Sequence, residues 1–124
     1  MNIALWVIQI LLALAFLVAG APKATQSIEA LSKRLTWAKD VPVPLVRFIG
    51  VAEILGALGL ILPALTGILP GLTIAAAVGL AIIQASAIIF HLMRGEARVI
   101  AGNIVLLALL LFVIYGRIAL APLA

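Results

Sequence analysis

The sequence predicts an all-α integral membrane protein, a transmembrane four-helix bundle with a short interfacial amphipathic helix between the first and second spans. Apolar residues make up 67% of the 124 residues and charged residues only 10%, whereas a soluble domain is nearer half apolar and a quarter charged. The apolar residues form four runs, each reaching the roughly 20 residues that cross a bilayer core. Because a backbone in hydrocarbon must bond to itself, we expect four helices in a single transmembrane domain, residues 1–124.

The predicted spans cover residues 3–21, 45–65, 68–93 and 99–120. The first ends in Ala19-Gly20-Ala21, which resembles a signal-peptidase site. However, no Lys or Arg precedes this run, and it is too long for the core of a signal peptide, so we interpret it as a span. The uncharged turn at 63–70 predicts a tight hairpin with Pro70 near a helix start.

The one long loop lies between the first two spans, and its residues 26–37 have a helical apolar pattern. Ile28, Leu31 and Leu35 recur at the spacing of one helix face, while the charged residues between them point elsewhere. This pattern predicts a short amphipathic helix along the membrane surface, with Trp37 as an interfacial anchor. A solvated loop is the alternative interpretation.

Positive charge is concentrated on one side of the predicted bundle. The first and third loops contain Lys23, Lys33, Arg34, Lys39, Arg94 and Arg98, whereas the opposite side has Arg117. The positive-inside rule places these loops in the cytoplasm and both termini outside. We expect the membrane to be a bacterial or archaeal plasma membrane. Because the cations flank spans and do not cluster on one exposed face, we expect the lipid bilayer, and no nucleic acid, as a partner.

The residue inventory excludes several kinds of chemistry. The chain has no cysteine and a single histidine, His91. Disulfide exchange, thiolate catalysis, Cys-ligated metals and a multi-His metal site within one chain are therefore excluded, and we expect no metal. A carboxylate and an imidazole could support acid–base chemistry, but no nucleophile accompanies them, so a stand-alone enzyme is the least favoured class. A haem held by one histidine is also disfavoured.

Small residues four apart indicate where helices approach closely. Ala52 and Gly56 lie in the second predicted span, and Ala75 and Gly79 lie in the third. Such pairs allow close helix packing in lipid. They are compatible with closure of the bundle and with a homodimer.

Polar side chains inside the spans form the candidate site, because they are costly in hydrocarbon. At about 1.5 Å per residue, Glu53 lies about 12 Å from the membrane face next to the charged loops, and His91 lies about 3 Å from it. Gln84 and Asn103 lie about 14 Å and about 6 Å from the same face. These groups, from three spans, therefore share one half of the membrane.

Two cations belong to the same half. Lys23 ends the first span, and Arg47 lies about 3 Å inside the second, from where its side chain could also reach lipid headgroups. A buried carboxylate needs a partner or a proton, and Lys23, Arg47, His91 and Asn103 are the candidates to pair with Glu53. Gln9 falls in the far half, and the sequence offers no explanation for it.

The polar set predicts a ligand-binding pocket with Glu53 and His91 at its centre. Intramembrane acids are generally functional, but a network that only locks the bundle is the alternative. For Gln84 and Asn103, hydrogen bonds between helices are the favoured role. The predicted ligand-binding residues are Glu53, His91, Asn103, Gln84, Arg47 and Lys23.

The chain resembles the DoxX-like family of small four-helix membrane proteins. The resemblance covers nearly the whole chain and rests on four features. They are Ala-Gly-Ala-Pro-Lys at 19–23, RFIGVAEILGALGLILP at 47–63, a third span ending in His91, and Asn103 early in the fourth. The second-span pattern is the most specific of these.

The resemblance implies the fold more strongly than a function. The namesakes of the family accompany a thiosulfate:quinone oxidoreductase of archaeal respiration, and distant relatives assist the assembly of other membrane proteins. We therefore expect a protein that binds an apolar small molecule with a polar head, such as a quinone, or an accessory subunit of a membrane redox system. The alternatives are an assembly or scaffold factor for a client membrane protein and a small dimeric carrier.

Overall fold

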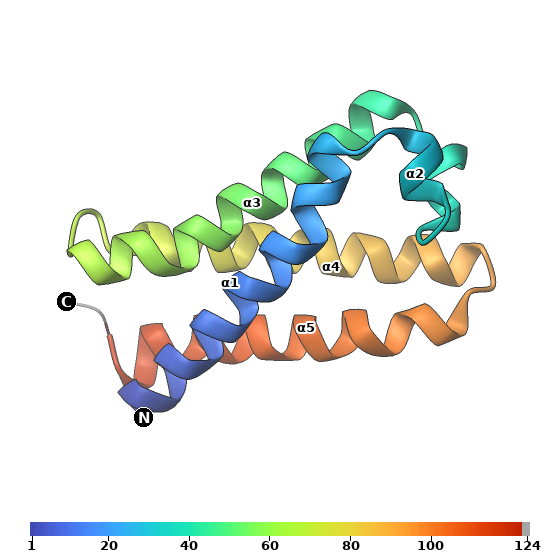
Figure 1. Ribbon diagram of the computed structural model, residues 1–124. Helices are drawn as coiled ribbons and strands as arrows, with labels where there is room; N and C mark the ends of the chain where they lie inside the picture. The colour runs from blue at the N-terminus through green and yellow to red at the C-terminus, as the bar shows by residue number, and fades with distance from the viewer. Residues whose placement is uncertain (123–124) are drawn as a thin grey trace.

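Four long helices form the protein, and each is long and apolar enough to span a membrane. The computed structural model describes residues 1–122 (Figure 1). The long helices are α1 (Asn2–Thr25), α3 (Val43–Thr66), α4 (Gly71–Met93) and α5 (Ala97–Tyr115), the last continued by the π-helical segment η2 (Gly116–Leu120). The prediction of an all-helical protein with four spans is thus confirmed, with boundaries shifted by a few residues.

The boundary shifts have local causes. α1 continues to Thr25 although Pro22 lies inside it, and this last turn forms with one backbone hydrogen bond fewer because proline has no N–H. α4 starts three residues later than predicted, since Gly67 and Leu69 have positive φ values of 72° and 48°. Gly67 closes α3 in the left-handed conformation, and Pro70 precedes the first residue of α4. The predicted hairpin with Pro70 at a helix start is confirmed.

The helices pack in sequence order, α1 on α3, α3 on α4 and α4 on α5. α1 crosses the bundle obliquely, and it approaches the end of α5 near the N-terminus (Figure 1). There Leu5 packs directly on Gly116, where a Cβ atom would lie 2.5 Å from the leucine. We call the end with Met1, the turn at 67–70 and η2 the hairpin end, and the opposite end the loop end.

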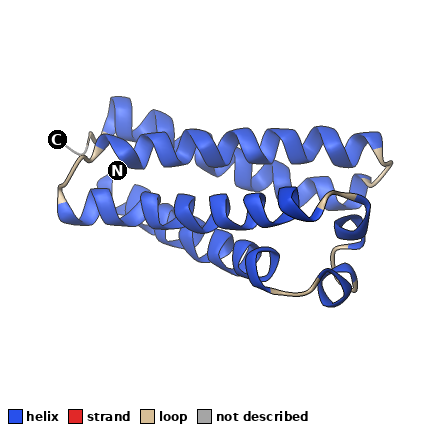
Figure 2. Ribbon diagram, turned by 90° about the horizontal axis from the view of Figure 1, so that it is seen from above, coloured by secondary structure: helices blue, strands red, loops and turns tan. Residues whose placement is uncertain are grey.

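The main hydrophobic core lies toward the hairpin end. Its buried members are Leu5, Leu12, Ala13, Phe16, Ala57, Leu60, Ala77, Leu80, Ala81, Leu110 and Val113. This core holds the helices together at one end and leaves α1 and α3 free to diverge from α4 and α5 at the other. The loop end carries two short helices, seen together beyond the long ones in Figure 2.

The segment between α1 and α3 differs from the single helix predicted for residues 26–37. It folds as α2 (Ile28–Ser32) and the 3₁₀ helix η1 (Thr36–Asp40), separated by a turn. Leu31 is fully buried and packs with Ala38 and with Val46 of α3. The apolar stripe thus packs on the protein itself, with α2 and η1 on either side of the turn. A position at the membrane surface stays a prediction.

Small residues mediate close helix contacts, but partly at other positions than predicted. A Cβ atom on Gly56 would lie 2.6 Å from Leu80, so the predicted second-span glycine does pack on α4. Gly79 instead faces outward, with no heavy atom within 4 Å of such a Cβ atom among the described residues. A close backbone approach between Gly20 and Gly50, which were not predicted to pack, joins α1 to α3.

Candidate functional site

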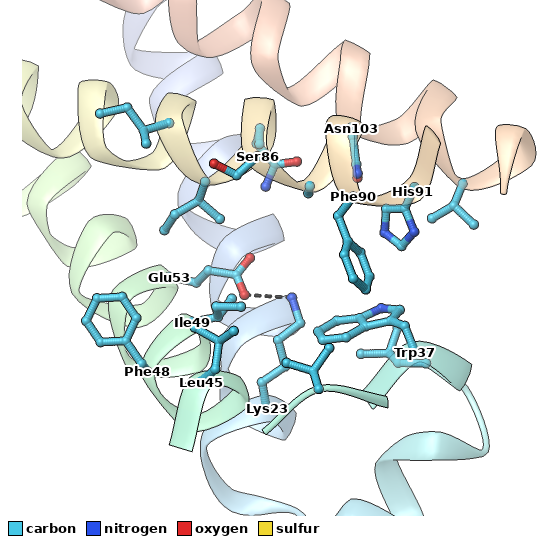
Figure 3. A pocket seen from close by; sticks show the side chains of 17 residues that line it. Lys23, Trp37, Leu45, Phe48, Ile49, Glu53, Ser86, Phe90, His91 and Asn103 are labelled. Atoms are coloured by element: carbon cyan, nitrogen blue, oxygen red, sulfur yellow. Dashed lines mark hydrogen bonds and ion pairs between the residues drawn. The ribbon is translucent and has the colours of Figure 1, made fainter. Parts of the chain in front are cut away.

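A pocket of about 480 Å³ lies at the loop end, where α3 and α4 diverge (Figure 3). Below it, Gly56 and Gly59 of α3 pack on Leu80 and Ala76 of α4. Toward the loops the two helices separate, and their facing side chains line the pocket. The polar residues of the lining are Lys23, Glu53, Gln84, Ser86, His91 and Asn103, and most of the other lining residues are apolar.

An ion pair between α1 and α3 forms one wall of the pocket. Lys23 Nζ donates to Glu53 Oε1 over 2.7 Å, and the Glu53 side chain is only 2% exposed. The contact between Gly20 and Gly50 brings the two backbones close enough for these side chains to meet. Of the four partners considered from sequence for Glu53, the structure therefore selects Lys23.

Arg47 contacts the backbone of this wall on the side away from the pocket. Its Nη1 atom donates to the backbone carbonyl of Lys23 over 2.8 Å. Arg47 was predicted as a ligand-binding residue, but it is not among the described residues that line the pocket. Its guanidinium caps a carbonyl in the last turn of α1, where a cation is favourable, and Arg47 thereby helps to position Lys23.

The opposite wall belongs to α4 and contains His91, which is 5% exposed. His91 Nδ1 lies 2.9 Å from Glu96 Oε1, and Arg94 Nε donates to the same oxygen over 2.9 Å. Arg94 Nη1 also donates to Asp40 Oδ2 over 3.0 Å, which ties the turn after α4 to η1. His91 and Glu53 each have a different charged partner, although both line one pocket.

The charged groups of this turn shift one another's proton affinities. The hydrogen bond from His91 holds the pKa of Glu96 below its ordinary value, and the nearby Arg94 guanidinium acts in the same direction. Hydrogen bonds to Asp40 and Glu96 raise the pKa of Arg94. Glu96 is therefore an ionised carboxylate at neutral pH.

Aromatic rings close the pocket on the loop side. Trp37 of η1 meets Phe90 edge-on, with ring centroids 6.0 Å apart, and meets His91 at 6.4 Å. Lys23 Nζ lies 5.9 Å from the centre of the Trp37 ring, within cation–π range. The tryptophan predicted as an interfacial anchor thus lines the pocket (Figure 3).

The two amide side chains also reach the pocket, Gln84 from α4 and Asn103 from α5. Gln84 Oε1 is buried and has no hydrogen-bond partner among residues 1–122. An unsatisfied buried acceptor costs about 1–3 kcal/mol. A ligand donor that paired with Oε1, after rotation of the Gln84 amide toward the pocket, would remove this cost. The expected hydrogen bond between helices is thus not formed by this oxygen.

A second polar cluster occupies the hairpin end, and sequence reasoning missed it. Arg117, 2% exposed, donates through Nε to Gln9 Oε1 at 2.7 Å and through Nη1 to Asn2 Oδ1 at 2.6 Å. Gln9 Nε2 in turn donates to the Leu60 carbonyl over 2.7 Å. The signal was present in the sequence, since Gln9 and Arg117 are the strongly polar side chains of opposite-running spans in the same membrane half.

Together the fold and the pocket define a class, that of small integral membrane proteins of four helices with a mainly apolar interior pocket and buried polar groups. Residues 7–113 match the DoxX-like family, and the chain belongs to it. The match contains every pocket residue named above but ends before Arg117. No curated protein and no solved structure matches the chain.

Proposed function

We propose that the protein binds an apolar small molecule with a polar head in the loop-end pocket, and that a quinone is the ligand class. The observation that carries the proposal is the combination of an apolar lining with buried polar groups inside a membrane protein. Small-molecule sites have volumes of roughly 300–1,000 Å³ and a few placed polar groups in an apolar wall. The pocket volume of about 480 Å³ lies in this range.

The polar groups suit the head of such a ligand. The Lys23 ammonium has three N–H donors, and the bond to Glu53 uses one of them. The remaining donors are available to a ligand carbonyl oxygen. The rings of Trp37 and Phe90 offer flat apolar faces to an aromatic head, and Asn103 adds a polar side chain from α5.

An apolar tail has a route into the bilayer. Phe48 of α3 and Ile82 of α4 line the pocket and are 66% and 62% exposed. Their exposed surfaces face the lipid that surrounds the spans, so a tail can leave the pocket between these helices. The same geometry supports the wider role of an accessory subunit that holds a quinone for a membrane redox system.

The lateral opening also favours a second candidate function, that of a scaffold for a client membrane protein. A neighbouring transmembrane helix could place a polar side chain between Phe48 and Ile82 and bond Lys23 or Asn103. A stoichiometric protein partner in gently solubilised material would favour this role. A co-purified isoprenoid found by mass spectrometry would favour the quinone.

The protein carries its own reporter for the proposed ligand. Of its two tryptophans, Trp37 lines the pocket, whereas Trp6 lies at the hairpin end beside Arg117. In a Trp6→Phe variant, titration with menadione should quench the Trp37 fluorescence with saturation. The matched Trp37→Phe variant retains Trp6 and should show only linear, collisional quenching. Linear quenching in both variants would count against a quinone site.

A further inference from the structure

The turn between α4 and α5 holds Glu96 against His91 by backbone geometry. Gly95 has a φ of 71°, the Glu96 N–H donates to the His91 carbonyl at 2.9 Å, and the Gly95 N–H donates to the Leu92 carbonyl at 3.1 Å. These two bonds form the Schellman motif that ends many helices at a left-handed glycine. The position of the Glu96 side chain is therefore set by the helix end as well as by its own hydrogen bonds.

This arrangement determines which nitrogen carries the proton whenever the His91 ring holds only one. Arg94 keeps Glu96 ionised by donating to the same carboxylate oxygen, and an ionised carboxylate accepts hydrogen bonds but cannot donate them. The proton must therefore reside on His91 Nδ1, which faces Glu96. In a neutral imidazole with a protonated Nδ1, the other nitrogen Nε2 is a hydrogen-bond acceptor.

The pocket thus has a donor and an acceptor on opposite walls. Lys23 supplies N–H groups from α1, and His91 Nε2 supplies a lone pair from α4, with the rings of Trp37 and Phe90 beside it. On the basis of the proposed function, we infer that His91 selects ligands that bear a hydroxyl group, such as a phenol or a quinol, over analogues with only carbonyl or ether oxygens. The hydroxyl donates to Nε2, while an ether oxygen placed there would face a second acceptor.

The inference also concerns the two forms of a quinone couple. A quinone has only acceptor oxygens, and Lys23 can satisfy one of them. The quinol has hydroxyl groups that can donate to His91 while one of its oxygens still accepts from Lys23. We therefore expect the reduced form to bind more tightly than the oxidised form.

A matched pair of redox-stable probes tests this directly. We suggest 4-methoxy-1-naphthol and 1,4-dimethoxynaphthalene, in which the same oxygen bears a hydrogen or a methyl group. Each is titrated anaerobically into the protein with the heat of binding as readout, because naphthalenes absorb and emit light where tryptophan does. One neutral hydrogen bond contributes about 0.5–1.5 kcal/mol, which corresponds to about a two- to tenfold higher affinity for the naphthol. Equal affinities would overturn the role of His91 while leaving the proposed function intact. Saturable binding of neither probe would overturn the proposed function itself.

Two variants separate this role from a structural one. His91→Phe should lose the preference for the naphthol, so that the ratio of the two affinities falls to about one whatever change the two probes share. Glu96→Gln frees the tautomer of His91 and should reduce the preference, whereas Glu29→Gln, which removes an exposed carboxylate from α2, should leave it unchanged. A preference that persists in His91→Phe would contradict the inference. If His91→Phe does not fold, the comparison of the two probes in the protein with His91 intact still tests it.

Discussion

The two ends of the bundle each pair a cation with polar partners, yet they do so in different surroundings. At the hairpin end, Arg117 donates to both Gln9 and Asn2 beside the main hydrophobic core. At the loop end, Lys23 and Glu53 bond at the wall of a pocket of about 480 Å³. The comparison teaches that a polar residue inside the membrane is not functional by its depth alone. Its neighbours decide whether it locks helices together or faces a space that a ligand can fill.

The largest effect is expected from Gln9→Leu, which breaks the hairpin-end cluster. The change leaves the buried Arg117 Nε without an acceptor, and we expect a loss of about 3 kcal/mol in the free energy of unfolding. Unfolding in mixed micelles measures it, with the lipid-facing Leu14→Ala as a control of small effect. Ligand affinity at a temperature where the variant is folded should be unchanged. A large loss of affinity there would break the distinction between the two ends.

Gly50→Ala should affect stability and binding together. Its Cβ atom would lie 2.6 Å from the Ala24 backbone nitrogen, so α1 must move away from α3. We expect a loss of about 2 kcal/mol in unfolding free energy and weaker binding, because Lys23 moves with α1. Gly79→Ala, on an open helix face, is the matched control and should retain both properties. An affinity unchanged in Gly50→Ala would show that the pocket tolerates displacement of Lys23.

Glu53→Gln tests the loop end and should have the opposite outcome to Gln9→Leu. We expect little change in stability and a clear change in binding. The Lys23 side chain is 13% exposed and lies at the end of α1, so its ammonium can turn toward water when it loses its partner. We expect a loss of about 1 kcal/mol in unfolding free energy and a fall in affinity of about tenfold. Calorimetric titration with menadione, beside Glu29→Gln as the control, measures the affinity. A variant with full stability and full affinity would remove Glu53 from the site.

The smallest effect concerns pH and the turn after α4. Hydrogen bonding from His91 lowers the folded-state pKa of Glu96 from its ordinary value near 4.5. A lowered carboxyl pKa contributes stability at pH values above the unfolded-state pKa, and this contribution is lost as the pH falls through the folded-state pKa. We therefore expect the melting temperature to decrease slightly once the pH drops under about 4.5. The Glu96→Gln variant should not show this decrease. Parallel curves for the two proteins would argue against the ion pair.

Much of the fold was predictable from composition and pattern. Four apolar runs, and a Pro70 that follows an uncharged turn, were sufficient to place the helices within a few residues. The placement of Lys23, Glu53, Gln84, His91 and Asn103 in one membrane half also followed from rise per residue alone. Depth along a helix axis depends only on the number of residues from the end of the span, so it can be calculated from the sequence.

Rotation and pairing were not predictable in the same way. Leu31 has the spacing of a lipid-facing stripe but is buried on Val46, and nothing in the sequence indicated that Trp37 lines the pocket. In lipid an apolar side chain is equally soluble on either face of a helix, so hydropathy does not report which face packs. Gly79 and Gly20 illustrate the point, since the first faces outward and the second mediates a close contact between α1 and α3.

The sequence by itself determined the membrane class, the four spans, the shared depth of the candidate site residues and the absence of cysteine chemistry. Only the tertiary structure decided that Glu53 bonds Lys23, that His91 bonds Glu96, that Arg47 lies behind the site, and that Gln9 belongs with Arg117. The physical reason is that hydrophobicity and helical rise act along the chain and can be summed residue by residue. A hydrogen bond between distant residues depends on the angle and spacing of two packed helices, which small residues such as Gly20 and Gly50 set through contacts across the bundle.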